Sequence, residues 1–140
     1  MKFLSWCTVS ELSIVNTDIP LAVADKLIKY HISPMTFVRE SLGDPITASQ
    51  RSGYRPKWYE INKGRSGNSQ HTFEDKGAVD WTTTGDMKKL LQLIIDFTTY
   101  TRICYYPNNR FIHCDYKNPV ERWEYVCKSP TSKWERVGKI

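Results

Sequence analysis

The segment from residue 102 to residue 116, RICYYPNNRFIHCDY, constrains the fold more than any other part of the chain. Two runs rich in apolar and aromatic residues flank the turn PNN, which is typical of a β-hairpin. A second pair of strand-like runs, 123–128 and 133–137, flanks the turn SPTS. The carboxy-terminal part of the sequence therefore predicts antiparallel strands.

The amino-terminal part shows helical periodicity instead. Apolar residues recur at helical spacing between residues 21 and 42, and Thr17-Asp18 is placed to cap this helix. Pro34 interrupts the stripe, so we expect a kink or a break just before it. Gly43 is expected to end the helix, because glycine readily adopts the left-handed conformation found at helix ends.

The middle of the chain alternates between strand-like and polar segments. Residues 45–55 indicate a strand that runs into a loop, and residues 56–70 a long polar loop of the kind that carries function. The sequence AVDWT is a short strand pattern. Residues 87–100 form a second amphipathic helix, which either Thr84 or Asp86 is positioned to cap.

This order of elements predicts an α+β fold, an antiparallel sheet packed against helices. A length of 140 residues suits one domain with one core, so we expect residues 1–140 to form a single domain. We also expect a monomer. The four cysteines include no Cys-x-x-Cys pair, and we expect them to be reduced and mostly buried.

The formal net charge of +5 is compatible with an anionic partner such as a bacterial cell wall. Lys88 and Lys89 form the only adjacent basic pair, so we expect no nucleic-acid partner. No apolar run approaches the roughly 18 residues that a membrane span requires. The beginning, MKFLSWCTVSELS, is too short and too soon polar for a signal peptide, which favours synthesis in the cytoplasm.

The three histidines differ in their surroundings. His31 lies near the apolar stripe of the first helix, where a packed structural residue is the better interpretation. His71 precedes the AVDWT strand, and His113 lies inside a strand. Asp80 lies between Val79 and Trp81, where an unpaired buried carboxylate would cost several kcal/mol. Two imidazoles and one carboxylate are a common ligand set for zinc, although a polar loop leading into an ordinary strand remains the alternative.

Several short motifs, read in chain order, resemble the D-alanyl-D-alanine carboxypeptidase-like zinc peptidases, which share their fold with the hedgehog signalling domain. The resemblance covers roughly residues 8–116. Its pieces are TVSEL at 8–12, RESLGDPI at 39–46, SGYRP at 52–56, Asn62, SQH at 69–71, GAVD at 77–80 and FIHCDY at 111–116. A single motif is weak evidence for this family, whereas all of them in the same order are much stronger evidence.

This resemblance implies that His71, Asp80 and His113 bind Zn²⁺. It implies that Arg55 faces the substrate and stabilises a developing oxyanion or binds a peptide carboxylate, tasks that suit a fixed charge with forked donors.

Three further residues receive roles from the same resemblance. Ser69 and Gln70 are expected to hydrogen-bond the substrate or to order the loop. Asp115 lies two residues beyond His113 and projects to the same side of its strand. It is expected either to orient the histidine from behind or to lie at the reaction site itself.

The sequence departs from the family pattern at the general base. Many members have a glutamate three residues before the last histidine, where this chain has Arg110. A hedgehog-like alignment would place a glutamate at Pro107 instead. The loop after His71, TFEDKG, is also two residues longer than in the family's shorter form. Three substitutes for the base are conceivable: Asp115, either acidic residue of this longer loop (Glu74 or Asp75), or a zinc ion that activates its water with little help from the protein.

Two functional hypotheses follow from the resemblance. The first is a zinc metallopeptidase of the DD-carboxypeptidase or endopeptidase type that hydrolyses D-amino-acid-containing stem or cross-bridge peptides of bacterial peptidoglycan. Such a protein would be a phage endolysin or cell-wall hydrolase, made in the cytoplasm and acting on the wall after release. The alternative is a non-catalytic, zinc-stabilised binding or structural module such as a phage virion component.

Overall fold

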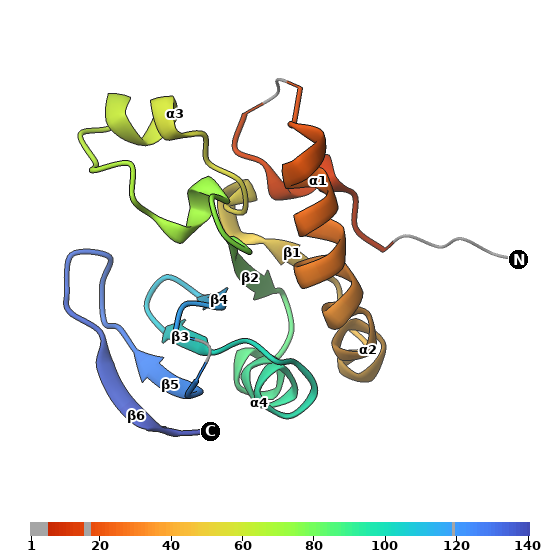
Figure 1. Cartoon of the computed structure of the whole chain (residues 1–140). Coiled ribbons are helices and arrows are strands. Elements are labelled where there is room, and N and C mark those ends of the chain that lie inside the picture. The colour runs from red at the N-terminus through yellow and green to blue at the C-terminus, as the bar shows by residue number, and fades with distance from the viewer. Residues whose placement is uncertain (1–5, 16–17, 119) are drawn as a thin grey trace, which may run out of the picture.

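The fold is built on a six-stranded sheet, with α1, α2 and α4 packed on one face (Figure 1). The computed structural model describes residues 6–15, 18–118 and 120–140. The strands are β1 (Ile46–Ala48), β2 (Ala78–Thr83), β3 (Arg102–Tyr106), β4 (Phe111–Asp115), β5 (Trp123–Val126) and β6 (Glu135–Lys139). The α-helices are α1 (Leu21–Leu27), α2 (Ser33–Leu42), α3 (Lys57–Asn62) and α4 (Met87–Phe97). The predicted α+β class is therefore confirmed.

The strands follow the spatial order β1-β2-β4-β3-β5-β6. Both predicted hairpins, β3–β4 and β5–β6, are present and antiparallel. The strand β5, however, pairs with β3 and runs parallel to it. Because β2 and β3 occupy both edges of β4, the chain leaving β4 cannot pair with it again, and β5 adds to the outer edge of β3.

Alternation of side chains along the strands gives the sheet two different faces. On β2, Val79 and Trp81 belong to the main hydrophobic core, and on β4 so do Ile112 and Cys114. The intervening residues face away from the helices. A smaller apolar cluster on that second face contains Cys104, Tyr106 and Cys127, with Trp134 packed against it. All four cysteines are buried.

The first helical region is interrupted as its proline predicts, but without a break in the chain. A π-helical turn, Ile28–Ile32, joins α1 to α2 immediately before Pro34. Proline lacks the N–H that would bond the carbonyl of Tyr30, four residues earlier. The Tyr116 hydroxyl donates to that carbonyl instead, at 2.6 Å. The π turn thus accommodates the proline, and a strand residue satisfies the freed acceptor.

The ends of the helices were predicted with mixed success. Gly43 ends α2 in the left-handed conformation with φ of 81°, as expected. Pro20, and not Asp18, is the N-cap residue of α1, while Thr17 lies outside the described residues. Of the two candidate caps for α4, Asp86 accepts hydrogen bonds from the backbone N–H groups of its first turn.

The segment 56–70 is not the uninterrupted loop that its polarity predicted. It contains α3, which starts directly after Pro56 and ends at Asn62. Proline at this position favours a helix start because its φ is fixed in the helical range. A 3₁₀ turn, η4 (Gln70–Thr72), follows the loop. The carboxylate of Glu60 is completely buried and forms an ion pair with Arg55, which ties α3 to the segment just before it.

His31 is a packed structural residue, as predicted. Its ring is completely buried, with Nδ1 2.7 Å from the Tyr100 hydroxyl and Nε2 2.9 Å from the carbonyl oxygen of Lys76. Tyr100 also accepts a hydrogen bond from the Trp81 indole at 3.1 Å. Burial lowers the pKa of His31 to about 3, so the ring is neutral in the folded protein at neutral pH.

This buried histidine predicts a specific loss of stability in acid. The unfolded chain protonates His31 near pH 6.5, whereas the folded protein excludes the proton until about pH 3. The free energy of unfolding should therefore fall as the pH drops below 6.5, by about 1.4 kcal/mol per unit for this group. We expect metal-free wild-type protein to lose about 2 kcal/mol more than His31→Gln between pH 6.5 and pH 5 in urea denaturation. Parallel pH profiles for the two proteins would contradict this assignment.

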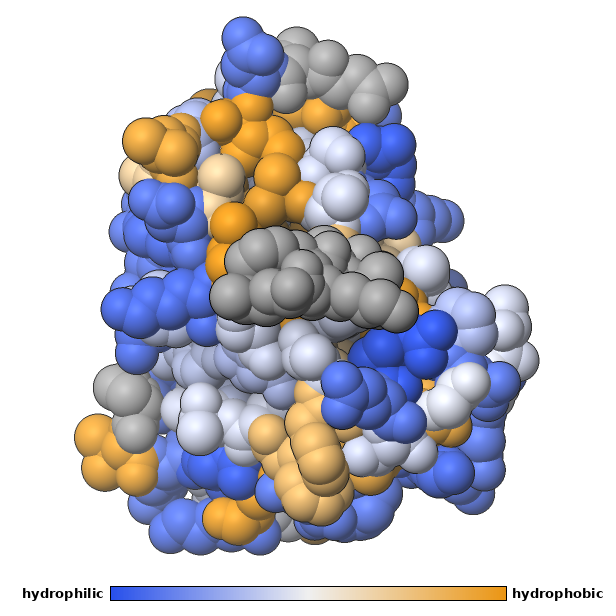
Figure 2. Space-filling model, turned by 90° about the vertical axis from the view of Figure 1, so that its right-hand side faces the viewer, coloured by the Kyte–Doolittle hydropathy of each residue, from blue (hydrophilic) through white to orange (hydrophobic). Residues whose placement is uncertain are grey.

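The outer surface of the helical layer carries exposed apolar side chains among hydrophilic ones (Figure 2). These exposed apolar residues include Leu21, Ile28, Phe37 and Phe97. The rings of Phe37 and Phe97 lie edge to face, 4.7 Å apart. No helix within the described ranges is both long and apolar enough to cross a membrane.

Candidate metal centre

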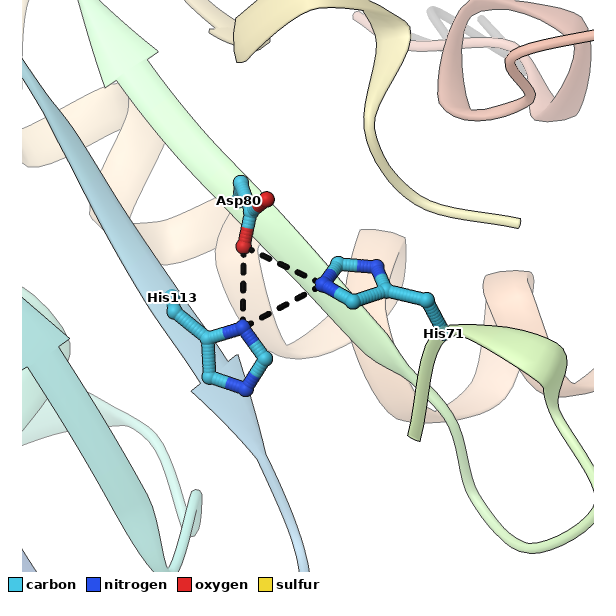
Figure 3. Close-up of side chains that lie close together, drawn as sticks. All are labelled: His71, Asp80 and His113. Atoms are coloured by element: carbon cyan, nitrogen blue, oxygen red, sulfur yellow. Dashed lines mark hydrogen bonds and ion pairs between the residues drawn. The ribbon is translucent and has the colours of Figure 1, made fainter. Parts of the chain in front are cut away.

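The structure brings together the three residues that the sequence singled out as metal ligands (Figure 3). His71 lies on η4, Asp80 on β2 and His113 on β4. His71 Nε2 is 3.2 Å from His113 Nδ1 and 3.3 Å from Asp80 Oδ1. The distance from His113 Nδ1 to Asp80 Oδ1 is 2.9 Å. All three side chains are buried, so their polar atoms have little access to bulk water.

Two of the three residues are placed by strand register. Asp80 and His113 are directly opposite each other in the antiparallel β2–β4 pair. Their side chains therefore project to the same face, away from the helical core. The alternation of apolar neighbours around each residue, visible in the sequence, fixes this face.

His71 is brought to the strands by backbone hydrogen bonds from the segment 52–55. The carbonyl of Ser52 accepts from the N–H of Asp80, and the N–H of Arg55 donates to the carbonyl of His71, each at 2.9 Å. The Ser69 hydroxyl oxygen accepts from the N–H of His71 and so caps η4. Through these backbone hydrogen bonds, the motif Ser-Gly-Tyr-Arg connects Asp80 on β2 with His71 in the loop.

Hydrogen bonds on the far side of each imidazole determine which nitrogen faces the cluster. His71 Nδ1 lies 2.8 Å from the Gly53 carbonyl oxygen, and this acceptor assigns the proton to Nδ1. His113 Nε2 lies 2.7 Å from Asp115 Oδ2, which likewise assigns a proton to Nε2. When each ring carries only this proton, the remaining nitrogens and Asp80 Oδ1 direct lone pairs to a common point.

The donor set and its spacing fit a tetrahedral zinc ion. Zinc prefers imidazole nitrogen and carboxylate oxygen at about 2.0–2.2 Å, which puts neighbouring ligand atoms roughly 3.3 Å apart. The three separations of 2.9 to 3.3 Å are close to this value. The second oxygen of Asp80 accepts from the Ser52 hydroxyl at 2.8 Å, which leaves one oxygen for the ion. Three protein ligands leave a fourth position for water or substrate.

The electrostatics of the metal-free cluster show what a cation would replace. Burial alone would lower the pKa of His113, but hydrogen bonds to Asp115 and Asp80 and their negative charges raise it to about 9. Burial would raise the pKa of Asp80, yet the two histidines hold it well below its usual range. Burial lowers the pKa of His71. Without a metal, His113 is therefore protonated on Nδ1 as well. This proton lies between His113 and Asp80, at the position that a metal cation would occupy.

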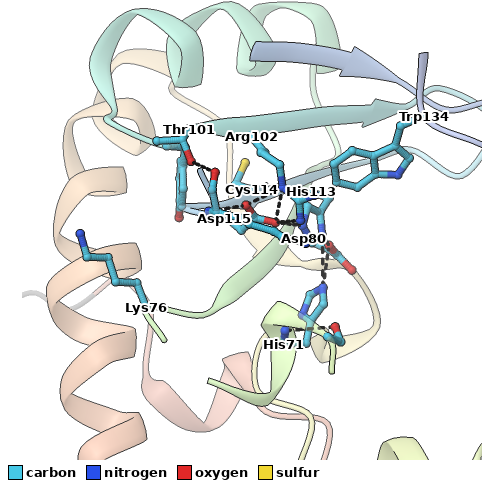
Figure 4. A network of polar contacts seen from close by, with 12 residues as sticks. His71, Lys76, Asp80, Thr101, Arg102, His113, Cys114, Asp115 and Trp134 are labelled. Carbon is cyan, nitrogen blue, oxygen red and sulfur yellow. Dashed lines mark hydrogen bonds and ion pairs between the residues drawn. The ribbon is translucent and has the colours of Figure 1, made fainter. Parts of the chain in front are cut away.

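Asp115 lies behind His113 and does not reach the ligand cluster (Figure 4). Its carboxylate is completely buried and accepts a bifurcated hydrogen bond from the single N–H of Arg102 Nε, at 2.9 and 3.1 Å, and another, at 2.6 Å, from Arg102 Nη2. The N–H of Lys117 donates to it as well, at 3.0 Å. Burial alone would raise the pKa of Asp115, but His113 and Arg102 lower it strongly. This carboxylate is thus an anchored anion that fixes the His113 ring.

The ligand cluster opens into a cleft of about 420 Å³. Arg55, Ser69 and Gln70 line it, as do Arg65 and Lys117. Asp80 is the only carboxylate among the described residues of its lining. The remaining lining residues are Asn68, His71, Arg102, Tyr106, Phe111, His113, Pro130 and Trp134.

The other candidate bases lie away from this cleft. Glu74 and Asp75 are exposed and do not belong to its lining, and the Glu74 carboxylate lies 3.9 Å from Lys57 Nζ. The Arg110 guanidinium donates to the carbonyls of Thr83 and Gly85. The extra length of the loop after His71 therefore does not bring an acid to the cluster.

Four residues that shape the site were not identified from the sequence: Ser52, Glu60, Arg65 and Arg102. Ser52 and Arg102 hold the two aspartates, while Glu60 forms ion pairs with both Arg55 and Arg65. Of these four residues, only Ser52 stands in a recognisable sequence motif, since it begins SGYRP. The partners of the other residues depend on strand pairing and on the path of the loop, which no local pattern encodes.

A family model described as Peptidase M15 matches residues 7–115 of this chain. The match contains all three residues of the cluster and ends at Asp115. No curated protein and no solved structure gives a significant match.

Proposed function

The chain belongs to the peptidase M15 family of metallopeptidases, and from this membership we propose that it is a zinc-dependent hydrolase of peptide bonds in bacterial peptidoglycan. The observation that carries the proposal is the convergence of His71 Nε2, Asp80 Oδ1 and His113 Nδ1 beside an open cleft. Zinc bound there would polarise a substrate carbonyl and lower the pKa of its bound water to about 7.

We propose that Arg55 is the main electrostatic contributor among the protein side chains. It lines the cleft and its side chain is 19% exposed. Its Nε lies 3.3 Å from Glu60 Oε1, but neither atom has a hydrogen-bond partner among the residues that the structure describes. The guanidinium is therefore held by charge and can direct its donors to a substrate oxyanion or carboxylate. Ser69 and Gln70 would provide polar contacts to the peptide from the same wall.

We assign Asp115 a positioning role. It holds the Nε2–H of His113, so that Nδ1 keeps its lone pair toward the metal position. Its remaining acceptor sites bind Arg102 and the backbone of Lys117, which leaves no free oxygen toward the cleft. A role as the proton acceptor in hydrolysis is therefore a poorer interpretation.

A missing carboxylate base affects the expected rate. A general base contributes typically 10²- to 10⁴-fold to such reactions. Because Asp80 is the one carboxylate among the described lining residues, we expect slow turnover that depends on the metal and Arg55. The same observation favours a second candidate function, a zinc-stabilised module that binds wall peptides without cleaving them.

The cell wall as substrate rests on the resemblance of the site motifs to D-alanyl-D-alanine carboxypeptidase-like peptidases. The positive charge of the cleft is compatible with the acidic peptides of peptidoglycan. We propose that the chain is a monomeric, single-domain wall hydrolase of the endolysin type that acts on the wall after release.

The test combines metal analysis with wall digestion. Purified protein should contain about one zinc ion per chain and should release new amino groups from isolated cell walls. A chelator should stop this release, and added Zn²⁺ should restore it. Bound zinc with no released amines from any wall preparation would refute the peptidase and favour the binding module. Protein that takes up no zinc would refute both.

A further inference from the structure

One wall of the cleft comes from a part of the chain that the family match does not include. The match ends at residue 115, whereas the hairpin of β5 and β6 follows later. From this hairpin, Pro130 and Trp134 line the cleft. In Figure 1 the turn of the hairpin reaches toward the segment that carries α3 and η4. The family motifs therefore supply the metal ligands, and the hairpin supplies part of the surface that meets the substrate.

Trp134 is held beside the metal ligands by contacts on several sides. Its indole Nε1 donates to the Tyr106 hydroxyl at 2.7 Å. The rings of Trp134 and His113 lie edge to face at 5.2 Å, and the Arg102 guanidinium lies 4.7 Å from the indole centroid (Figure 4). The side chain is nevertheless only half-buried. A fixed aromatic surface next to a ligand histidine is thus available to a substrate.

The charges around the cleft indicate what kind of substrate this surface would meet. Arg55 and Arg65 share the single carboxylate of Glu60, which leaves one positive charge unbalanced. Lys117 adds another, while the charge of Arg102 is matched by Asp115. Asp80 in the lining offsets one of these two charges. The cleft therefore still has an excess of positive charge facing an indole, which suits a peptide that carries both a carboxylate and an aliphatic portion.

We propose that Trp134 is a specificity-determining residue that binds the aliphatic portion of an acidic peptide next to the metal ligands. The proposal rests on the proposed function and adds a substrate-binding wall to it. The alternative is that Trp134 only stabilises the small apolar cluster of Cys104, Tyr106 and Cys127. A purely structural role would not change substrate binding separately from folding and metal content.

The same hairpin offers a matched control. Trp123 is half-buried as well, but it is absent from the lining of the cleft and lies against the guanidinium of Arg136, 4.2 Å from its ring centroid. Truncation of Trp123 removes an indole from the hairpin without altering the cleft wall. A difference between the two truncations therefore reports on the cleft.

The test compares Trp134→Ala, Trp134→Phe and Trp123→Ala on soluble stem peptides released from cell walls. For Trp134→Ala we expect KM to rise about tenfold, which is about 1.4 kcal/mol of binding free energy, with one zinc ion retained and kcat within about threefold. Trp134→Phe should keep most of the affinity because it retains an aromatic face, and Trp123→Ala should change KM less than about twofold. An unchanged KM in Trp134→Ala would overturn the proposal. So would a loss of zinc or of folded protein in both Trp134 variants.

A binding measurement separates this proposal from the proposed function. If wild-type protein with bound zinc cleaves no peptide, the peptidase function fails and the same variants are compared by calorimetric titration with the same peptides. Weaker binding by Trp134→Ala than by Trp123→Ala would still support the specificity role. Equal binding by all variants, or no binding by the wild type, would refute it.

Discussion

Replacing His71 with alanine should abolish both zinc retention and hydrolysis. In the proposed zinc site His71 supplies one of three protein ligand atoms, and it comes from η4 whereas the other two come from strands. If the roughly 10–16 kcal/mol of a protein zinc site is shared among three ligands, loss of one should weaken binding by about 10²- to 10⁴-fold. The expected result is protein without zinc after dialysis and wall-digesting activity at the level of chelated wild type.

The third histidine provides the control for this experiment. His31 is equally buried but is bonded to Tyr100 and Lys76, and it does not belong to the cluster. His31→Gln should therefore retain one zinc ion per chain at pH 7.5, measured by elemental analysis and by competition with a chromophoric chelator. Full zinc content in His71→Ala, or loss of zinc from His31→Gln alone, would show that the metal lies elsewhere.

Replacing Asp115 with asparagine should destabilise the protein and weaken the metal site together. The amide cannot balance the charge of Arg102, and its NH₂ group would point a donor at either Arg102 or the Nε2–H of His113. Breaking a buried ion pair from one side typically costs about 3–5 kcal/mol. Loss of the group that orients a ligand histidine typically reduces metal affinity by about 10- to 100-fold.

Two comparisons distinguish this effect from a general loss of negative charge. Asp96→Asn alters an exposed carboxylate that accepts a hydrogen bond from the neighbouring Gln92 side chain, and it should change stability by less than about 0.5 kcal/mol. Adding Arg102→Leu to Asp115→Asn removes the uncompensated cation and should recover part of the stability but none of the zinc affinity. Urea denaturation and zinc competition measure the two quantities. Asp115→Asn protein with wild-type values in both assays would rule out the positioning role.

Two residues of the candidate metal cluster could be placed from the sequence because local patterns determine which way their side chains project. Alternation along AVDWT and FIHCDY places Asp80 and His113 on polar faces between core residues, and the structure pairs these two residues across β2 and β4. Their surroundings were not predictable in the same way. Arg102 meets Asp115 only because β3 and β4 pair in one particular register. Glu60 meets Arg55 and Arg65 only after α3 forms inside a segment that reads as a loop.

The carboxy-terminal hairpin shows the same limit. Its two strands were predicted from the turn SPTS, and they are present. Its position beside β3 follows from the pairing of β2 with β4, two strands that lie far apart in the sequence. No local pattern around Trp134 distinguishes a tryptophan of the core or of a sheet edge from one that lines a cleft. The structure adds that the same indole forms part of the cleft beside His113.

The pairing of Asp80 with His113 across β2 and β4 has a consequence for how the native sheet is selected. A slip of one residue between these strands would turn one of the two side chains to the helical face, because side chains alternate along a strand. A metal ion can therefore be bound only by chains that have formed the correct long-range pairing. Its binding free energy is added to that arrangement and to no other, by mass action. The ion would thus stabilise the native register of β2 and β4 selectively, in addition to any part it takes in hydrolysis.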